Sequence, residues 1–318
     1  MRDADLPTRV PVAGFPASVT VYEVGPRDGL QNEAGTVALA DKAAFVRRLV
    51  AAGLRTVEVT SFVHPAWVPQ LADAAELVAT LAASGDFVPD AMPVLVPNVA
   101  GLERALAGGA GHIGVFASAT ESFAQHNLNR GLHTQFDMIG PTVARALAAD
   151  ARVRGYVSMC FGDPWEGAVP IESVVGVGLR LLELGVDQLS LGDTIGVGTP
   201  GHVEALVEAF DRAGVPRDRL ALHFHDTYGQ AVGNVQAGLR AGVTTFDASA
   251  GGLGGCPYAL SATGNLATED LVWLLDGLGI EHGIDLDALV DTSLWMASVL
   301  GRPAPSKVVA ALSKGEQS

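Results

Sequence analysis

The feature that most restricts the fold of this chain is a regular alternation of two residue patterns. Short runs rich in β-branched residues, such as VTVYEV at 19–24, alternate with longer segments rich in alanine and leucine. The first pattern is typical of strands and the second of helices. Strands that alternate with helices form parallel sheets. Roughly eight such units at fairly even spacing favour a closed (β/α)8 TIM barrel over the alternative, an open doubly wound sheet.

These patterns predict the positions of the individual elements. Strands are expected at 19–24, 56–62, 92–97, 112–118, 153–161, 188–194, 220–227 and 244–250. Helices are expected at 38–53, 70–83, 101–109, 136–150, 172–185, 201–214, 229–242 and 266–279. Residues 284–301 predict a further helix or two. We therefore expect one domain over 1–318, with a barrel over about 18–280 and a C-terminal helical extension over about 281–318.

Composition excludes several classes of partner. The 318 residues carry a formal net charge of −15, so the basic surface that nucleic-acid binding requires is absent, and an anionic membrane is an unsuitable partner. No apolar run is long enough to span a membrane or to act as a secretory signal. The two cysteines, Cys160 and Cys256, cannot form a disulfide framework. A cytoplasmic protein is expected.

Two histidines in one expected strand form a candidate metal site. In His223-Phe224-His225 the two imidazoles are two residues apart and so lie on one face of the strand. Asp28 after the first expected strand and Asn265 after the last can complete the ligand set, because strand ends converge at one rim of a barrel. Two nitrogens and two oxygens suit Mg²⁺ or Mn²⁺, although the residue types also permit zinc. The alternative is a pair of hydrogen-bonded core histidines.

Two further motifs carry groups that can take part in catalysis. In GPRDGLQNE at 25–33, Arg27 precedes Asp28, and its guanidinium can hold a carboxylate or enolate oxygen. The alternative is a salt bridge at the rim. In GGLGGCPY at 251–258, Cys256 follows four glycines, which favours an acid/base or nucleophilic thiol over a buried one. Glu58 lies within the second expected strand and Asp193 ends the sixth.

The segments VGPRDGLQNE, VEVTSFVHPAWVPQ, LGDTIGVGTPG, LHFHDTYGQ and GGLGGCPYALSATGN together resemble the hydroxymethylglutaryl-CoA lyases, over roughly residues 20 to 300. By position, the resemblance implies the metal ligands Asp28, His223, His225 and Asn265. It implies catalytic or supporting roles for Arg27, Cys256, Glu58 and Asp193. It implies substrate contacts from Arg27, Gln31, Arg154 and Tyr156.

The resemblance also implies an activity. We expect Mg²⁺- or Mn²⁺-dependent cleavage of 3-hydroxy-3-methylglutaryl-CoA, a small acyl-CoA thioester, by a homodimer. Departures from the family pattern leave the exact acyl substrate open, and one of them is the region after Ser118 with Gln125-His126-Asn127-Leu128-Asn129, which matches only loosely. The chain has Gly162-Asp163-Pro164-Trp165-Glu166-Gly167 where many relatives have Gly-Cys-Pro-Tyr-Glu-Gly, and Ala66 where lysine is frequent. The alternatives are a lyase for a longer-branched hydroxyglutaryl-CoA, a Claisen-type synthase, a zinc hydrolase and an inactive binding scaffold.

Overall fold

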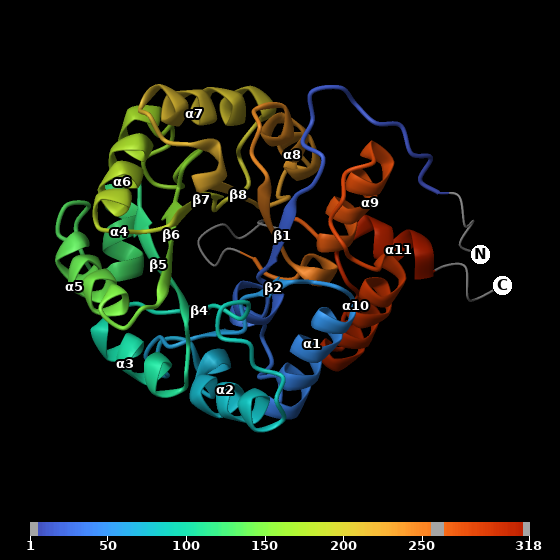
Figure 1. Ribbon diagram of the computed structural model, residues 1–318, viewed down its shortest axis with the longest axis horizontal. Coiled ribbons are helices and arrows are strands. Elements are labelled where there is room, and N and C mark those ends of the chain that lie inside the picture. Colours follow the sequence, from blue (N-terminus) through green and yellow to red (C-terminus); the bar gives the residue numbers. More distant parts are fainter. Residues whose placement is uncertain (1–5, 256–263, 314–318) are drawn as a thin grey trace.

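Strands and helices alternate along the computed structural model, which describes residues 6–255 and 264–313 (Figure 1). The strands are β1 (Thr20–Glu23), β2 (Thr56–Val57), β3 (Thr60–Ser61), β4 (Val94–Leu95), β5 (His112–Ser118), β6 (Arg152–Ser158), β7 (Gln188–Asp193), β8 (Leu220–Phe224) and β9 (Thr245–Ala248). The α-helices are α1 (Leu39–Ala51), α2 (Ala74–Ala83), α3 (Val99–Ala107), α4 (Glu121–Leu128), α5 (Phe136–Leu147), α6 (Ile171–Glu183), α7 (Pro200–Arg212), α8 (Ala231–Arg240), α9 (Thr268–Leu278), α10 (Leu286–Leu300) and α11 (Lys307–Ser313). Short helical turns are η1 (Gly25–Gly29), η2 (Pro69–Leu71), η3 (Arg217–Arg219) and η4 (Ala250–Gly252).

The strands form one parallel sheet that closes on itself. Their order is β2-β1-β9-β8-β7-β6-β5-β4-β3, so β2 and β3 are at its two ends. These two strands are parts of one short segment, 56–61. Within it, the backbone N–H of Glu58 donates to the carbonyl oxygen of Glu23, the last residue of β1 (2.8 Å), and that of Val59 donates to the carbonyl oxygen of Pro93, directly before β4 (3.0 Å). The segment therefore joins both edges, which confirms the expected (β/α)8 barrel.

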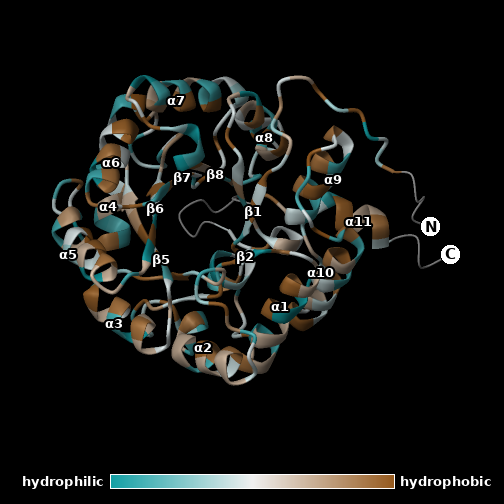
Figure 2. Cartoon of the chain, viewed as in Figure 1, coloured by the Kyte–Doolittle hydropathy of each residue, from teal (hydrophilic) through white to brown (hydrophobic). Residues whose placement is uncertain are grey.

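The surrounding helices are amphipathic. In α7 the buried residues Val203, Leu206, Val207 and Phe210 recur with the three- and four-residue spacing of one helix face. Figure 2 shows hydrophobic and hydrophilic residues together on the outer helices. The strands are covered on both faces, and all five residues of β8 are buried.

The C-terminal extension is helical, as expected. Helix α10 packs against α1, and α11 packs against α9 and α10 (Figure 1). The side chain of Asp285 begins α10 by accepting the backbone N–H groups of Asp287 (2.9 Å) and Ala288 (3.1 Å). The Arg48 guanidinium of α1 lies 4.7 Å from the ring centre of Trp295 in α10.

The described part of the chain includes no helix whose length and apolarity would suffice to cross a membrane.

Two buried carboxyl groups hold the segment that follows β9. Glu23 accepts the backbone N–H of Ala250 (2.9 Å) and the hydroxyl of Thr268 (2.7 Å). Glu269 accepts the backbone N–H of Gly251 through both oxygens (3.1 and 2.9 Å) and the hydroxyl of Ser293. Burial raises the pKa of Glu23 to about 7 and the pKa of Glu269 to about 8. These two carboxyl groups therefore stay protonated to a higher pH in the folded protein than exposed carboxyl groups do.

This arrangement predicts a pH-dependent stability difference for Glu269→Gln. The folded-state pKa of Glu269 lies above its usual value of 4.5, so its stabilising contribution is complete below pH 4.5 and is lost as pH rises through about 8. Relative to the wild type, the variant should gain free energy of unfolding between these limits, by roughly 1.4 kcal/mol per unit of pKa difference at most. Urea unfolding at a series of pH values measures this. Exposed Glu76→Gln is the control, and a pH-independent difference for Glu269→Gln would contradict the expectation.

Candidate metal centre and active-site cavity

The turn after β1 places two charged residues at the mouth of the barrel. It is the single π-helical turn η1, in which the N–H groups of Arg27, Asp28 and Gly29 all point to the carbonyl oxygen of Val24 (3.1, 2.7 and 3.1 Å). Single π-turns often occur at functional sites. Gly25 begins this turn, and a Cβ there would lie 2.6 Å from the Glu23 carboxylate. The local sequence therefore holds Arg27 and Asp28 side by side at the C-terminal end of the strands.

Three of the expected metal ligands converge at this end. His223 lies in β8, and His225 is the first residue after this strand ends. Both side chains extend toward Asp28, and the centres of their imidazole rings are 5.3 Å apart. One potential ligand atom from each of the three residues lies within 4.8 Å of the others. Nε2 of His223 is 4.0 Å from Oδ2 of Asp28. This spacing leaves room for an ion between the groups rather than a direct hydrogen bond.

Unpaired polar atoms at the same place support a cation site. Nδ1 of His225 and Oδ1 of Asn265 are buried and make no hydrogen bond of normal geometry within the described residues. The Asn265 amide nitrogen donates to Oδ2 of Asp28 (2.9 Å) and to the Leu253 carbonyl (3.0 Å). Buried polar atoms without partners are rare in proteins unless a ligand, ion or water satisfies them. Two imidazoles, a carboxylate and an amide oxygen therefore fit a divalent cation.

A glycine permits the close approach of the chain beside Asn265. Gly254 has φ of +112°, and a Cβ at this position would lie 2.5 Å from the Asn265 amide nitrogen. Any other residue would displace the side chain that contacts Asp28. The segment beyond Gly255 contains Cys256, which lies outside the described residues, so its predicted catalytic role stays a prediction. The Asn32 amide nitrogen donates to the carbonyl oxygen of Gly255 (2.8 Å), which lines the cavity.

Electrostatics favour the ligand forms of these side chains. Burial by itself would raise the pKa of Asp28, but the Arg27 guanidinium, and after it the two imidazoles, hold this pKa well below its usual value. Burial, and after it the neighbouring His223, lowers the pKa of His225 to about 4. At neutral pH the site therefore offers an ionised carboxylate and a neutral His225 imidazole. Metal ions bind these forms and not the protonated ones.

Arg27 and Glu58 form a buried ion pair at the edge of the site. Nε of Arg27 donates to Oε2 of Glu58 (2.5 Å), and the hydroxyl of Tyr156 donates to Oε1 (3.0 Å). Burial raises the pKa of Glu58 despite the opposing effect of Arg27. Arg27 and Tyr156 line the cavity, as does Gln31, another predicted substrate contact. Glu58 is fully buried and fixes the orientation of Arg27 through this ion pair.

Arg154, a predicted substrate contact, lies deeper in the barrel. Its guanidinium forms two hydrogen bonds with the carboxylate of Asp247 (2.6 and 3.1 Å) and one with the Tyr156 hydroxyl (3.1 Å). The side chain is 1% exposed and is not among the described residues that line the cavity. Asp247 was missed in the sequence. The signal for it was a single carboxyl residue inside an otherwise uncharged strand, TTFDASA.

Asp193, a predicted supporting acid, organises the loop between β7 and α7. Its carboxylate accepts the backbone N–H groups of Val197 (2.9 Å) and Gly198 (2.9 Å). Burial raises the pKa of Asp193 to about 6 despite these hydrogen bonds. Asp226 next to His225 points elsewhere and accepts the N–H of Ala231 at the start of α8 (2.9 Å).

Three of the candidate ligands, Asp28, His223 and His225, line a cavity of about 430 Å³. One end contains Arg27, Asp28, His223 and His225, and the rest of the lining combines apolar side chains with polar ones such as Asn98 and Asn127. The apolar lining includes Val63, Val68, Leu95, Pro97, Phe116, Phe123, Leu128 and Met138. A site with one charged end and an apolar wall suits a substrate that has both an oxygen-rich head and a hydrocarbon branch.

The segment 162–167, which departs from the family pattern, lies behind this wall. Oδ1 of Asp163 accepts the backbone N–H groups of Trp165 (2.7 Å) and Glu166 (2.9 Å), and Oδ2 accepts the hydroxyl of Thr120 (2.7 Å). The Trp165 ring stacks on His126 with centres 4.1 Å apart, and His126 lines the cavity. The aspartate therefore organises a loop that supports one wall of the cavity.

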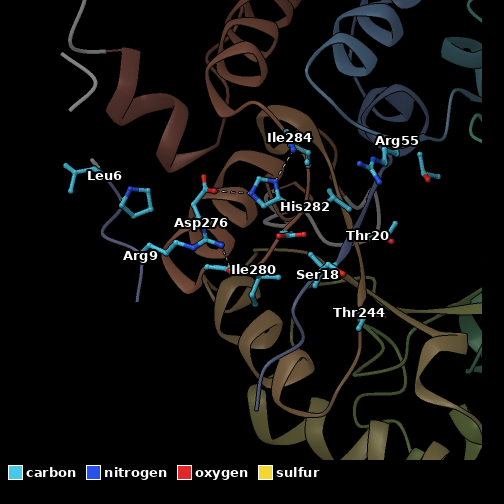
Figure 3. Close-up of a pocket in the computed structure, with 17 residues that line it drawn as sticks. Leu6, Arg9, Ser18, Thr20, Arg55, Thr244, Asp276, Ile280, His282 and Ile284 are labelled. Carbon is cyan, nitrogen blue, oxygen red and sulfur yellow. Dashed lines mark hydrogen bonds and ion pairs between the residues drawn. The ribbon is translucent and has the colours of Figure 1, made fainter. Parts of the chain in front are cut away.

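A second pocket, of about 1260 Å³, lies at the opposite ends of the strands. It is lined by residues at the starts of β1, β2 and β9 and by the N-terminal segment that crosses them. In Figure 3, Arg9, Asp276 and His282 lie on one side of it and Arg55 on the other. The predicted site residues do not line this pocket, as far as the structure describes them.

The chain resembles known lyases over most of its length. The model of the HMGL-like family matches residues 18–295. The 3-hydroxy-3-isohexenylglutaryl-CoA/hydroxymethylglutaryl-CoA lyase of Pseudomonas aeruginosa is 46% identical over 298 residues, which cover 94% of this chain and 98% of that protein.

Solved structures agree with this similarity. The crystal structure of hydroxymethylglutaryl-CoA lyase from Pseudomonas aeruginosa has a TM-score of 0.90 at 45% identity, and covers 95% of this chain and 99% of that one. An HMG-CoA lyase from Acinetobacter baumannii, in complex with coenzyme A and 3-methylmalate, has a TM-score of 0.86 at 32% identity, with coverage of 95% and 97%.

The geometry predicts that Asp28→Asn weakens metal binding. The variant keeps the size of the side chain but removes the negative charge that faces both imidazoles, so the affinity for Mn²⁺ should fall by more than about tenfold. Isothermal titration of Mn²⁺ into the metal-free protein measures this. Asp226→Asn is the matched control, because this carboxylate lies one residue from His225 but contacts Ala231. Equal affinities for the Asp28→Asn variant and the wild type would exclude Asp28 as a ligand.

Proposed function

Because the chain belongs to the HMGL-like family, we propose that it cleaves 3-hydroxy-3-methylglutaryl-CoA into acetyl-CoA and acetoacetate, as a carbon–carbon lyase that uses Mg²⁺ or Mn²⁺. One observation carries this proposal. The potential ligand atoms of Asp28, His223 and His225 lie within 4.8 Å of one another, beside a buried arginine that lines the same cavity. We further propose a homodimer, which the family resemblance implies, and a cytoplasmic location, which the composition favours.

The cation would be held by Asp28, His223 and His225, with the Asn265 amide oxygen as a fourth ligand. When bound, such a cation lowers the pKa of a coordinated hydroxyl and orients it. Breakage of the C2–C3 bond requires the C3 hydroxyl to lose its proton while its oxygen becomes the ketone of acetoacetate. The candidate groups that accept this proton are Asp28, the imidazoles and Cys256.

Arg27 would stabilise the second fragment. The electron pair of the broken bond passes to C2 and the thioester carbonyl, which gives the enolate of acetyl-CoA. The Arg27 guanidinium lines the cavity, and its contacts with Asp28 and Glu58 fix its orientation before the substrate binds. A preorganised donor of this kind stabilises developing negative charge effectively. A proton delivered to C2, for which Cys256 is the candidate donor, completes acetyl-CoA.

The activity can be tested directly. Purified protein, Mg²⁺ and 3-hydroxy-3-methylglutaryl-CoA should yield equal amounts of acetoacetate and acetyl-CoA, and a chelator should stop the reaction. Failure to form acetoacetate with either Mg²⁺ or Mn²⁺ would overturn the proposed function.

A longer-branched substrate is the second candidate. The Pseudomonas aeruginosa relative is named for 3-hydroxy-3-isohexenylglutaryl-CoA as well as for the methyl compound. The apolar wall of the cavity in this chain favours an extended hydrocarbon branch, since burying each additional CH₂ contributes about 0.8 kcal/mol. The ratio of kcat/KM for the two thioesters decides between them.

Arg27→Gln should reduce kcat by about 10²–10³ and leave the Mn²⁺ affinity much less affected, because the guanidinium acts on the enolate rather than on the ion. Steady-state kinetics and metal titration measure the two effects separately. Arg47→Gln is the control, since Arg47 pairs with Asp86 on the surface. A kcat close to that of the wild type would exclude the proposed role of Arg27 at the enolate.

Cys256→Ala should preserve the fold and metal affinity but abolish most of the cleavage, because it removes the candidate donor of the proton to C2. Circular dichroism, Mn²⁺ titration and acetoacetate formation measure these properties. Cys160→Ala is the matched control, because Cys160 is fully buried and donates its thiol to the Val157 carbonyl. Full activity of Cys256→Ala would assign the proton step to another group.

A further inference from the structure

The two nitrogens of the His223 ring face two different carboxylates. Nε2 points to the candidate metal centre and is 4.0 Å from Oδ2 of Asp28. Nδ1 points into the barrel and is 3.2 Å from Oδ2 of Asp247. His223 and Asp247 are direct neighbours in the register of β8 and β9, so their side chains project inward together. The barrel therefore places a carboxylate behind this candidate metal ligand.

Asp247 is held by donors from two further strands. Arg154 of β6 donates to both of its oxygens (2.6 and 3.1 Å), and the hydroxyl of Ser190 of β7 donates to Oδ2 (2.8 Å). The side chains of Arg154 and Asp247 are 1% and 0% exposed. A buried carboxylate that is paired with a guanidinium is ionised and can only accept hydrogen bonds. Its contact with His223 therefore requires the proton on Nδ1.

From this geometry we propose that Asp247 is a positioning residue, which fixes His223 in the Nδ1–H tautomer so that the lone pair of Nε2 faces the metal. Metal-binding histidines commonly donate their second ring nitrogen to a carboxylate, and the loss of such a partner typically costs about 10–100-fold in metal affinity. Arg154 acts one step further away by holding Asp247. Arg154 would then act through Asp247 and not through the substrate contact that the sequence predicts.

His225 differs from His223 in this respect. Its Nδ1 makes no hydrogen bond of normal geometry to any residue that the structure describes. Asp247 itself is unsuited to metal ligation, because both of its oxygens already accept hydrogen bonds. It is also not among the described residues that line the cavity. The orienting effect of Asp247 is therefore specific to one of the two imidazoles.

The tautomer can be read without metal or substrate. In metal-free protein labelled with ¹⁵N-histidine, the Nδ1 and Nε2 shifts of His223, assigned by comparison with His223→Gln, should report a proton on Nδ1 at neutral pH. Asp247→Asn should move the proton to Nε2. The asparagine oxygen is needed by Arg154, so its amide group faces Nδ1 as a donor. The affinity for Mn²⁺ should fall by about 10–100-fold in this variant.

Two variants serve as controls. Ser190→Ala removes a neutral donor from the same carboxylate and should retain the Nδ1–H tautomer. Asp276→Asn removes the carboxylate from the His282–Asp276 pair (3.0 Å), away from the cavity, and should leave Mn²⁺ affinity unchanged. These controls separate the effect on His223 from general disturbance of the barrel or loss of a histidine–carboxylate contact.

The wild-type spectrum tests the proposal even if Asp247→Asn does not fold. An Nε2–H tautomer of His223 in the wild type would overturn it, as would an unchanged tautomer and Mn²⁺ affinity in a folded Asp247→Asn variant. The inference rests on the proposed metal-dependent function, but the two fail separately. Absence of cleavage with the Nδ1–H tautomer present would count against the proposed function alone.

Discussion

The interior of this barrel depends on one continuous set of buried polar contacts. In order, they join Arg27, Glu58, Tyr156, Arg154, Asp247, His223 and Asp28, which contacts Arg27 again. Two guanidinium groups and three carboxylates give this set a formal charge of −1 when the carboxyl groups are ionised. A buried charge without a partner costs several kcal/mol, so each member constrains the next. The link between His223 and Asp28, at 4.0 Å, is too long for a hydrogen bond, and a cation can occupy this place.

This set of contacts connects the fold to the chemistry. Its upper members, Arg27 and Asp28, face the cavity, whereas Arg154 and Asp247 lie below and touch no part of it. Buried groups contact those that face the cavity, since Glu58 contacts Arg27 and Asp247 contacts His223. Charges act strongly there, since the surrounding protein has a lower effective dielectric constant than water. The same low dielectric constant raises the free-energy cost of a proton on the wrong ring nitrogen of His223. The tautomer of this residue therefore affects metal binding.

The sequence was sufficient for most of the fold and for the part of the site that projects from strand ends. Runs of β-branched residues and segments rich in alanine and leucine identified most of the elements, and the even spacing of the units identified the barrel, which is confirmed. Asp28, His223 and His225 were placed together because strand ends converge, and their ligand atoms do lie close to one another. The interior contacts could not be predicted in the same way. Asp247 lies 24 residues from His223 along the chain, and only the β8–β9 register brings the two into contact.

Local sequence by itself determined most of the elements and their order, although not helix α4, and placed His223 and His225 on one face of the chain. These properties depend on residues within a few positions of one another. The tertiary structure alone decided which groups become partners. It placed Glu58 beneath Arg27, Arg154 behind Asp247 and Asp247 behind one nitrogen of His223. These pairings depend on the stagger of neighbouring strands and on closure of the sheet through residues 56–61. Both arise from packing of the whole barrel rather than from any segment of the chain.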